Sequence, residues 1–120
     1  MILVDTSVWV DHFRNGNAQL KAWLNDNEVI VHPFVIGELA CGSIRNRSEV
    51  LSLLSELPEA TVANHDEVMT FVENNRLYGT GIGWIDAHLA ASALLSKSML
   101  ITLDKPLSKI AAALGLHPPK

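Results

Sequence analysis

At 120 residues, the chain is long enough for one domain with an apolar core and too short for two. Hydrophobic residues make up 48% of it, which excludes wholesale disorder, and no apolar run approaches the roughly 20 residues needed to cross a bilayer. The net charge of −4 excludes a general affinity for nucleic acid based on surplus lysine and arginine. If the substrate is RNA, its attraction must come from a local basic patch, from bound metal, or from both.

The first residues, MILVDTSVWVDHF, have no basic stretch ahead of the apolar one, so we expect no signal peptide. A single cysteine, Cys41, cannot form an internal disulfide, which is typical of proteins from a reducing cytoplasm. We therefore expect one cytoplasmic domain over residues 1–120, with no membrane attachment.

Continuous apolar runs at residues 1–4 and 99–103 predict strands that are covered on both faces, as in a parallel sheet. Helical spacing of apolar residues predicts most of what lies between them. In chain order, the predicted elements are a strand over 1–4, a helix over 18–24, a strand over 28–31, helices over 33–43 and 48–57, a short strand over 61–63, a helix over 65–77, a glycine-rich loop over 79–83, a helix over 84–96, a strand over 99–103, a helix from Pro106 to Gly115, and an edge strand or tail over 114–118.

Strands separated by helices predict an α/β fold: a three-layer α/β/α sandwich with a mostly parallel central sheet. In such sheets, ligands bind beyond the carboxyl ends of the strands. Asp5 and Asp104 stand directly after the first and last strands, so both are expected there if those strands are neighbours. The alternatives are structural: a helix cap for Asp5, and a turn residue before Lys105 for Asp104.

Glu38 and Asp86 lie on helices in apolar settings. In a helix, the neighbours of Glu38 at three and four residues are Phe34, Val35, Cys41 and Gly42, none of which is a cation. Asp86 falls on the side of its helix that carries Ala90 and Ala93, away from a polar stripe formed by His88, Ser92 and Ser96. The alternative for Asp86 is a first-turn acid favoured by the helix dipole.

A buried carboxylate is protonated, paired or bound to a metal ion. Asp5, Glu38, Asp86 and Asp104 lack evident cationic partners in the sequence, and oxygen-only ligands select hard cations such as Mg²⁺ or Mn²⁺. Such an ion binds a phosphate oxygen and supplies a hydroxide, which suits phosphodiester hydrolysis. The hydroxyls of Thr6, Ser7 and Thr102 are expected to orient the carboxylates or waters on the metal.

With these residues in place, the chain resembles the PIN-domain nucleases, and within them the VapC-type toxins of bacterial toxin–antitoxin pairs. The resemblance runs through the whole chain in the family's order, in the segments LVDTSVWVDHFR from Leu3, PFVIGELACG from Pro33, GIGWIDAHLAASALL from Gly81 and LITLDKPLSKIA from Leu100. Each segment alone is weak, but the set is highly specific. The segment from Asn46 to Asn75 is only generically similar.

The resemblance implies a PIN-like α/β/α fold and an endoribonuclease that depends on Mg²⁺ or Mn²⁺. It places the family's four catalytic and metal-binding acids at Asp5, Glu38, Asp86 and Asp104, with the accompanying hydroxyls at Thr6 or Ser7 and at Thr102. It also implies a homodimer and a VapB-type antitoxin that covers the active site. Structured cellular RNAs, especially transfer RNA, are typical targets, and nothing in this sequence selects one.

Other features carry less chemistry. Residues 79–83 fail the dinucleotide fingerprint and lack the lysine of a Walker loop, and the five histidines show no metal-ligand spacing. Trp9 and Trp84 lie near proposed acids, where either base stacking or core packing is expected. Arg14 and Arg45 are expected to guide substrate phosphates, with a solvated surface position as the alternative.

Two other functions compete with the nuclease. A phospho-receiver domain requires paired acids after the first strand and an aspartate at the end of a middle strand. Here Thr6 and Ser7 follow Asp5, and the predicted strand over 28–31 ends without an aspartate, which disfavours this class. A PIN-like RNA- or protein-binding module that has lost catalysis is disfavoured by the presence of all four acids, although their presence does not prove their geometry.

Overall fold

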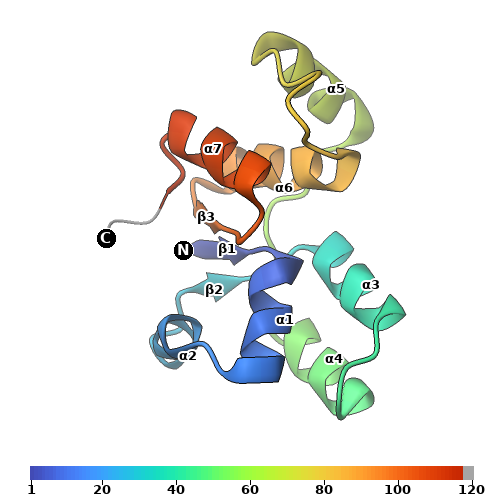
Figure 1. Ribbon diagram of the computed structural model, residues 1–120, viewed down its shortest axis with the longest axis vertical. Coiled ribbons are helices and arrows are strands. Elements are labelled where there is room, and N and C mark those ends of the chain that lie inside the picture. The colour runs from blue at the N-terminus through green and yellow to red at the C-terminus, as the bar shows by residue number, and fades with distance from the viewer. Residues whose placement is uncertain (118–120) are drawn as a thin grey trace.

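The computed structural model describes residues 1–117 of the chain. Within that range, three strands alternate with helices in the order shown in Figure 1. The strands are β1 (Ile2–Val4), β2 (Val29–Ile30) and β3 (Met99–Ile101). The helices are α1 (Thr6–Asn15), α2 (Ala18–Asn25), α3 (Pro33–Cys41), α4 (Arg47–Ser55), α5 (His65–Asn74), α6 (Trp84–Ser96) and α7 (Lys105–Ala113).

The described strands form a parallel sheet in the order β2-β1-β3. Leu3 at the centre of β1 pairs with Ile30 of β2 on one side and with Leu100 of β3 on the other. Because all three strands run the same way, their carboxyl ends lie along one edge, where α1, α3 and α7 begin (Figure 1). The predicted parallel sheet is confirmed, and β1 and β3 are neighbours in it, which is the condition for Asp5 and Asp104 to lie close together.

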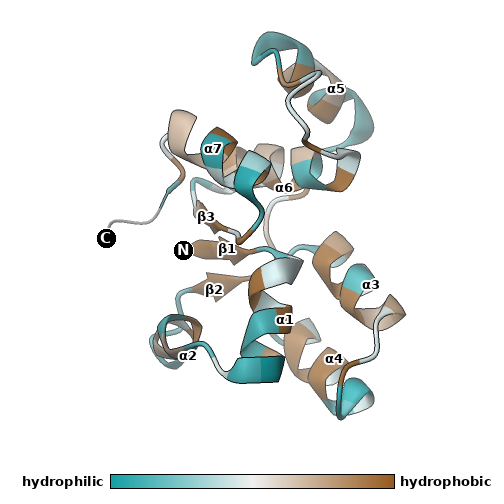
Figure 2. Cartoon of the chain, in the orientation of Figure 1, coloured by the Kyte–Doolittle hydropathy of each residue, from teal (hydrophilic) through white to brown (hydrophobic). Residues whose placement is uncertain are grey.

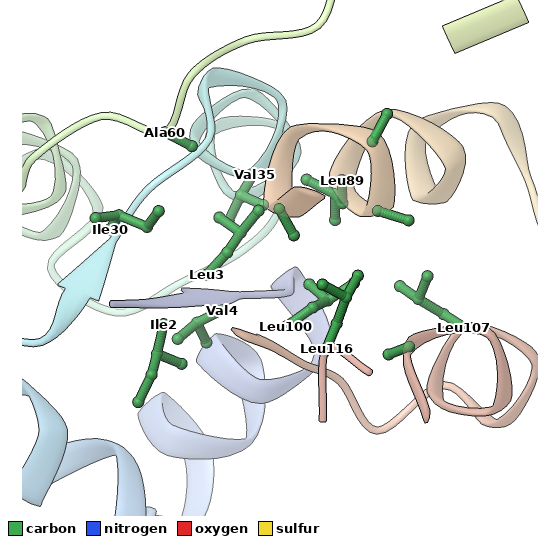
Figure 3. Close-up of a cluster of buried hydrophobic side chains, with 14 of the residues drawn as sticks. Ile2, Leu3, Val4, Ile30, Val35, Ala60, Leu89, Leu100, Leu107 and Leu116 are labelled. Carbon is green, nitrogen blue, oxygen red and sulfur yellow. The ribbon is translucent and has the colours of Figure 1, made fainter. Parts of the chain in front are cut away.

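Helices cover both faces of the sheet, as the predicted α/β/α sandwich requires. Figure 3 shows β1 nearly edge-on, with Val35 of α3 and Leu89 of α6 on one side of it and α1 on the other. Leu3, Val35 and Leu89 are completely or almost completely buried. Burial of each such side chain stabilises the fold by about 1.5–3 kcal/mol. The strands are hydrophobic along their length, while α1 and α5 carry hydrophilic stretches that face solvent (Figure 2).

Element boundaries differ from the sequence predictions mainly at helix ends. Helix α3 ends at Cys41, two residues before the predicted end, and α5 ends at Asn74, before the predicted Leu77. Helix α1 was not predicted as an element, although the interpretation of Asp5 as a cap assumed a helix beginning at Thr6. Helix α6 has the predicted bounds, Trp84–Ser96.

The predicted strand over 61–63 is wrong, because α6 takes its backbone N–H groups. Thr61 N–H donates to Ser96 Oγ at 2.8 Å, and Ala63 N–H donates to Ser92 Oγ at 3.2 Å. The sheet is extended one step earlier in the chain, where Val31 forms a parallel bridge with Glu59. The Ser92 and Ser96 hydroxyls of the polar stripe on α6 therefore bind this neighbouring segment.

At the other side of the sheet, the chain returns to β3 after α7. Leu100 N–H donates to Leu116 O at 2.7 Å, although residues 114–117 form no strand. The last residue of the predicted edge strand or tail, Pro118, lies outside the described residues. Within residues 1–117, no helix combines the length and the apolar character needed to cross a membrane.

Candidate active site

The proposed acids come from four different elements that meet at the carboxyl edge of the sheet. Asp5 and Asp104 follow the β1 and β3 strands and stand at the N-caps of α1 and α7. Glu38 lies in α3, and Asp86 lies in the first turn of α6. Two strand ends and two helices therefore converge on one place, as the switch-point rule for parallel sheets predicts.

Asp5 is the most buried of these acids, with 5% of its surface exposed. Its backbone N–H continues the ladder to Ile101 O at 3.0 Å, which fixes the residue at the end of the sheet. Asp5 occupies the N-cap position of α1, but its side chain makes no capping hydrogen bond, so capping does not explain the carboxylate. The carboxylate instead accepts hydrogen bonds from Ser7 Oγ at 2.8 Å and Thr102 Oγ1 at 2.7 Å, both at Oδ2.

The same two hydroxyls hold the loop that follows β3. Ser7 Oγ accepts from the backbone N–H of Leu103 at 3.0 Å, and Thr102 Oγ1 accepts from the N–H of Asp104, also at 3.0 Å. Each hydroxyl thus accepts a hydrogen bond from a backbone N–H and donates one to the Asp5 carboxylate. Asp5 Oδ2 is therefore held by two hydroxyl donors, each of which is fixed in turn by a backbone N–H.

Glu38 is solvent-exposed, so its predicted place on a buried apolar face is wrong. Of the apolar neighbours that motivated the prediction, Val35 is buried in the core, but Phe34 and Cys41 are exposed and line a surface groove together with Glu38. The Glu38 carboxylate accepts a hydrogen bond from Thr6 Oγ1 at 2.7 Å. Thr6 thereby connects the start of α1 to α3.

Asp104 has a structural role in addition to its place beside the other acids. Its Oδ2 accepts from the backbone N–H of Leu107 at 3.1 Å, which caps the N-terminus of α7. The side chain is exposed, and this bond occupies only one of the two carboxylate oxygens. The structural interpretation and the functional one are therefore compatible for this residue.

Asp86 is half-buried, and its surroundings oppose its negative charge. Burial is the largest cause that raises its pKa above the usual range, followed by the negative charges of Asp5 and Asp104. A backbone hydrogen bond from Gly83 lowers the pKa, and Glu38 raises it by the smallest contribution. The other three acids therefore all act electrostatically on the Asp86 carboxyl group, and within the described residues no cation shifts its pKa.

The contribution of Gly83 was missed from the sequence because it comes from the backbone. A residue at the N-cap leaves its own N–H free for the side chain at the third helical position, which here is Asp86. The three-residue spacing of Gly83 and Asp86 at the start of an apolar helix is the sequence pattern that could have indicated this hydrogen bond. Besides carrying the acid, the helix N-terminus stabilises its charged form.

The donor set fits a hard divalent cation held mainly through water. Asp5, Asp104 and Glu38 raise the pKa of Asp86, so the four carboxylates together provide negative charge that such a cation relieves. Within residues 1–117, no three Asp, Glu, His or Cys side chains come close enough to form a closed metal cluster. Mg²⁺ sites that use one or two carboxylates, waters and a substrate phosphate need no such cluster.

A cleft of about 440 Å³ opens beside Glu38 and Thr6, and both predicted substrate-binding arginines line it. Arg14 comes from α1, and Arg45 comes from the loop between α3 and α4. Arg45 lies outside α3, because that helix ends at Cys41. The loop nevertheless brings Arg45 to the Glu38 side of the site.

The two tryptophans near the acids have different surroundings. Trp9 is 3% exposed and stacks on Phe13, so core packing is the correct interpretation and base stacking at Trp9 is excluded. Trp84 is exposed and contacts His88 edge-to-face at a ring-centroid distance of 4.8 Å. Together with Phe34, it lines an apolar groove on the side of Glu38 that faces α6.

Comparison with known proteins agrees with this architecture. The PIN domain family matches residues 2–113. Ribonuclease VapC32 of Mycobacterium tuberculosis, from strains CDC 1551 and H37Rv, is 48% identical over 117 residues, which cover 97% of this chain and 94% of the relative. The crystal structure of PAE2754 from Pyrobaculum aerophilum superposes with a TM-score of 0.58 at 19% identity, covering 95% of this chain and 88% of that one.

A match over nearly the whole sequence, with the parallel sheet and the acids at its carboxyl edge, defines the class. The chain belongs to the PIN-domain family. The resemblance to the VapC-type members of that family, which the four sequence segments indicated, is confirmed by the relative at 48% identity. The likeness to PAE2754 supports the fold alone.

Proposed function

We propose that this protein is the toxin of a type II toxin–antitoxin pair and acts as a metal-dependent endoribonuclease. The observation that carries the proposal is the electrostatic convergence of Asp5, Glu38 and Asp104 on the half-buried Asp86, without a cation among the influences described. The name of the relative VapC32, a ribonuclease, supports RNA as the substrate. The carboxylates and their position at the sheet edge support a phosphodiester bond as the reacting group.

The proposed roles of the acids follow from their environments. Asp5 is held by Ser7 and Thr102 in one orientation, so it serves as the fixed ligand of the site. Asp86, whose raised pKa brings it nearer to the pH of the cell, is the group best suited to hold and return a proton during hydrolysis. Asp104 and Glu38 complete the rim, where exposed oxygens reach solvent and substrate.

A divalent cation, Mg²⁺ or Mn²⁺, would be held by oxygens of these four acids. When bound, it supplies Lewis acidity at a phosphate oxygen and a lowered pKa for an attacking water. Thr6, Ser7 and Thr102 position the carboxylates through their hydrogen bonds, and mispositioned carboxylates lose metal affinity and rate.

The proposal extends to the biological setting of a VapC-type toxin. It comprises a single PIN domain over residues 1–120, a homodimer in the cytoplasm, a VapB-type antitoxin as the protein partner, and cellular RNA, such as transfer RNA, as the substrate. The similarity to the mycobacterial ribonuclease VapC32, at 48% identity, supports the antitoxin as partner and RNA as substrate. Light scattering of the purified protein and co-purification with the product of an adjacent reading frame test the assembly.

The reaction is tested by incubating the protein with total RNA, with and without Mg²⁺ or Mn²⁺, and mapping the ends produced. Asp5→Asn and Asp86→Asn remove charge from the two most enclosed acids without changing their size. We expect metal-dependent cleavage that both variants lose. Equal cleavage in a metal chelator, or by either variant, would contradict the proposed mechanism, whereas RNA binding without cleavage by the wild type would favour a binding module.

A further inference from the structure

The cleft lined by Arg14 and Arg45 brings two positive charges together on a protein whose net charge is negative. The chain carries a net charge of −4, yet this cleft joins two arginines from separate segments. Both side chains are exposed, and within residues 1–117 neither guanidinium forms a hydrogen bond or ion pair. Arg47, which lies two residues after Arg45, instead donates its Nε–H to Ala40 O at 2.9 Å and holds the loop in place.

The cleft is continuous with the carboxylate site through two shared residues. Thr6 and Glu38 line the cleft and are joined by a hydrogen bond of 2.7 Å. Glu38 is exposed, whereas Asp86 is half-buried and Asp5 is buried, so Glu38 lies on the outer side of the site. The cleft therefore begins at the outer rim of the acids and runs away from Asp86 toward Arg14 and Arg45.

We propose that this cleft binds the sugar–phosphate backbone of single-stranded RNA next to the phosphate that is cut. The inference rests on the proposed ribonuclease function and names the path that the substrate takes. Charge complementarity favours a polyanion over a peptide, because the two guanidinium groups have no acidic partner within the described chain. The cleft volume of about 440 Å³ lies within the usual size range of ligand sites on proteins.

The composition of the cleft fits this ligand in a second way. Phe13 and Ile44 are half-buried beside the arginines and provide an apolar wall for sugar and base. Arginine forms paired hydrogen bonds with phosphate oxygens, which position the strand without selecting a base. The cleft thus supplies the local basic patch that an acidic protein needs to hold RNA.

The test measures RNA affinity apart from catalysis. A fluorescently labelled single-stranded RNA of mixed sequence is titrated with the full-length protein in a metal chelator at several salt concentrations. Each phosphate contact on a single strand contributes about 0.7 to the slope of log K against log salt, which is about 5-fold in affinity near 0.1 M salt. Arg14→Gln/Arg45→Gln is expected to bind about 25-fold more weakly, with a slope smaller by about 1.4.

The matched control is Lys21→Gln/Lys97→Gln, which removes the same charge from exposed positions outside the cleft. Lys97 precedes β3 and so lies at the opposite edge of the sheet from the acids. We expect the control to change the Kd by less than about twofold and to keep the slope. An unchanged slope in the arginine variant, or an equal change in the control, would overturn the inference.

A second readout separates this inference from the proposed function. With Mg²⁺ present, the arginine variant should raise KM and leave kcat within about twofold, whereas Asp86→Asn should lower kcat. If the wild type cuts RNA and the arginine variant matches it in Kd and KM, the cleft inference fails and the ribonuclease stands. If the wild type binds RNA with the expected arginine dependence but never cuts it, the ribonuclease fails and the cleft stands. Loss of protein-partner binding with unchanged RNA affinity would assign the cleft to a protein and overturn the inference.

Discussion

Thr102 Oγ1 donates a hydrogen bond of 2.7 Å to Asp5 Oδ2, joining residues 97 positions apart in the chain. The same hydroxyl oxygen accepts from the backbone N–H of Asp104 at 3.0 Å. A single threonine therefore links the carboxylate that follows β1 to the backbone of the acid that follows β3. The orientation of Asp5 and the position of Asp104 depend on each other through this side chain.

Thr102→Val keeps the shape of the side chain and removes its hydroxyl. We expect a loss of about 10- to 100-fold in RNA cleavage or metal affinity, because Asp5 loses one of its two orienting donors and the Asp104 N–H loses its acceptor. Single-turnover cleavage at several Mg²⁺ concentrations measures both effects.

Thr102→Ser is the matched control, since it keeps the hydroxyl and removes only a methyl group. It should retain most of the activity and the metal affinity of the wild type. If valine and serine behave alike at this position, the hydroxyl bridge has no part in positioning Asp5.

Asp86→Asn is expected to stabilise the metal-free protein. The raised pKa of Asp86 means that its ionised form destabilises the fold, and this destabilisation develops as the pH rises from 3.8 through the raised pKa. The melting temperature of the variant should therefore exceed that of the wild type near pH 7, and less so in acid. Added Mg²⁺ or Mn²⁺ should stabilise the wild type more than the variant, because a ligand stabilises the folded state that it binds.

Asp66→Asn provides the comparison for this effect. Asp66 is also a first-turn acid, at the start of α5, but it lies outside the group of acids that acts on Asp86. Its replacement should lower stability slightly through the helix dipole and leave the response to metal unchanged. Identical metal responses in all three proteins would refute the proposed site.

Because of His32, we expect the folded protein to lose stability in acid. The side chain is fully buried, its Nδ1 accepts from the Phe34 N–H at 2.9 Å, and its Nε2 is among the buried atoms without a hydrogen-bond partner in the described chain. Burial, with a smaller contribution from His88, lowers its pKa from 6.5 to about 4. Because the folded pKa is the lower one, the stabilisation is present above pH 6.5 and is lost as the pH falls toward 4.

The expected loss is roughly 3 kcal/mol across this window, measured by urea unfolding at a series of pH values. His32→Asn keeps a capping side chain at the start of α3 and has no titratable group. It should be less stable than the wild type at neutral pH and lose less on acidification. Parallel curves of unfolding free energy against pH for the two proteins would assign the acid sensitivity to other groups.

The sequence predicted the architecture because the sheet has a simple pattern. The apolar runs before Asp5 and Asp104 form neighbouring parallel strands, and α6 has its predicted bounds. The strand over 61–63 was predicted wrongly because the conformation of this segment depends on contacts with side chains of α6. Ser92 and Ser96 bind its N–H groups, and no local pattern in 61–63 records that contact.

Burial of the acids was less predictable than their position. Helical spacing described the neighbours of Glu38 within α3 correctly, but it did not show that this apolar side is a surface groove. Asp5 was ambiguous between a cap and a site residue, and it is the most enclosed of the four because hydroxyls from two other positions close over it. Such enclosure depends on contacts between distant segments.

The central claim is that these four acids form one metal-dependent ribonuclease site. The most direct measurement is RNA cleavage by wild-type protein and by Asp86→Asn, each with Mg²⁺ and with a chelator, using the folded state of both proteins as a check. The account predicts cleavage only by the wild type with Mg²⁺. Cleavage that persists in the chelator, or that the variant performs at the wild-type rate, would contradict it.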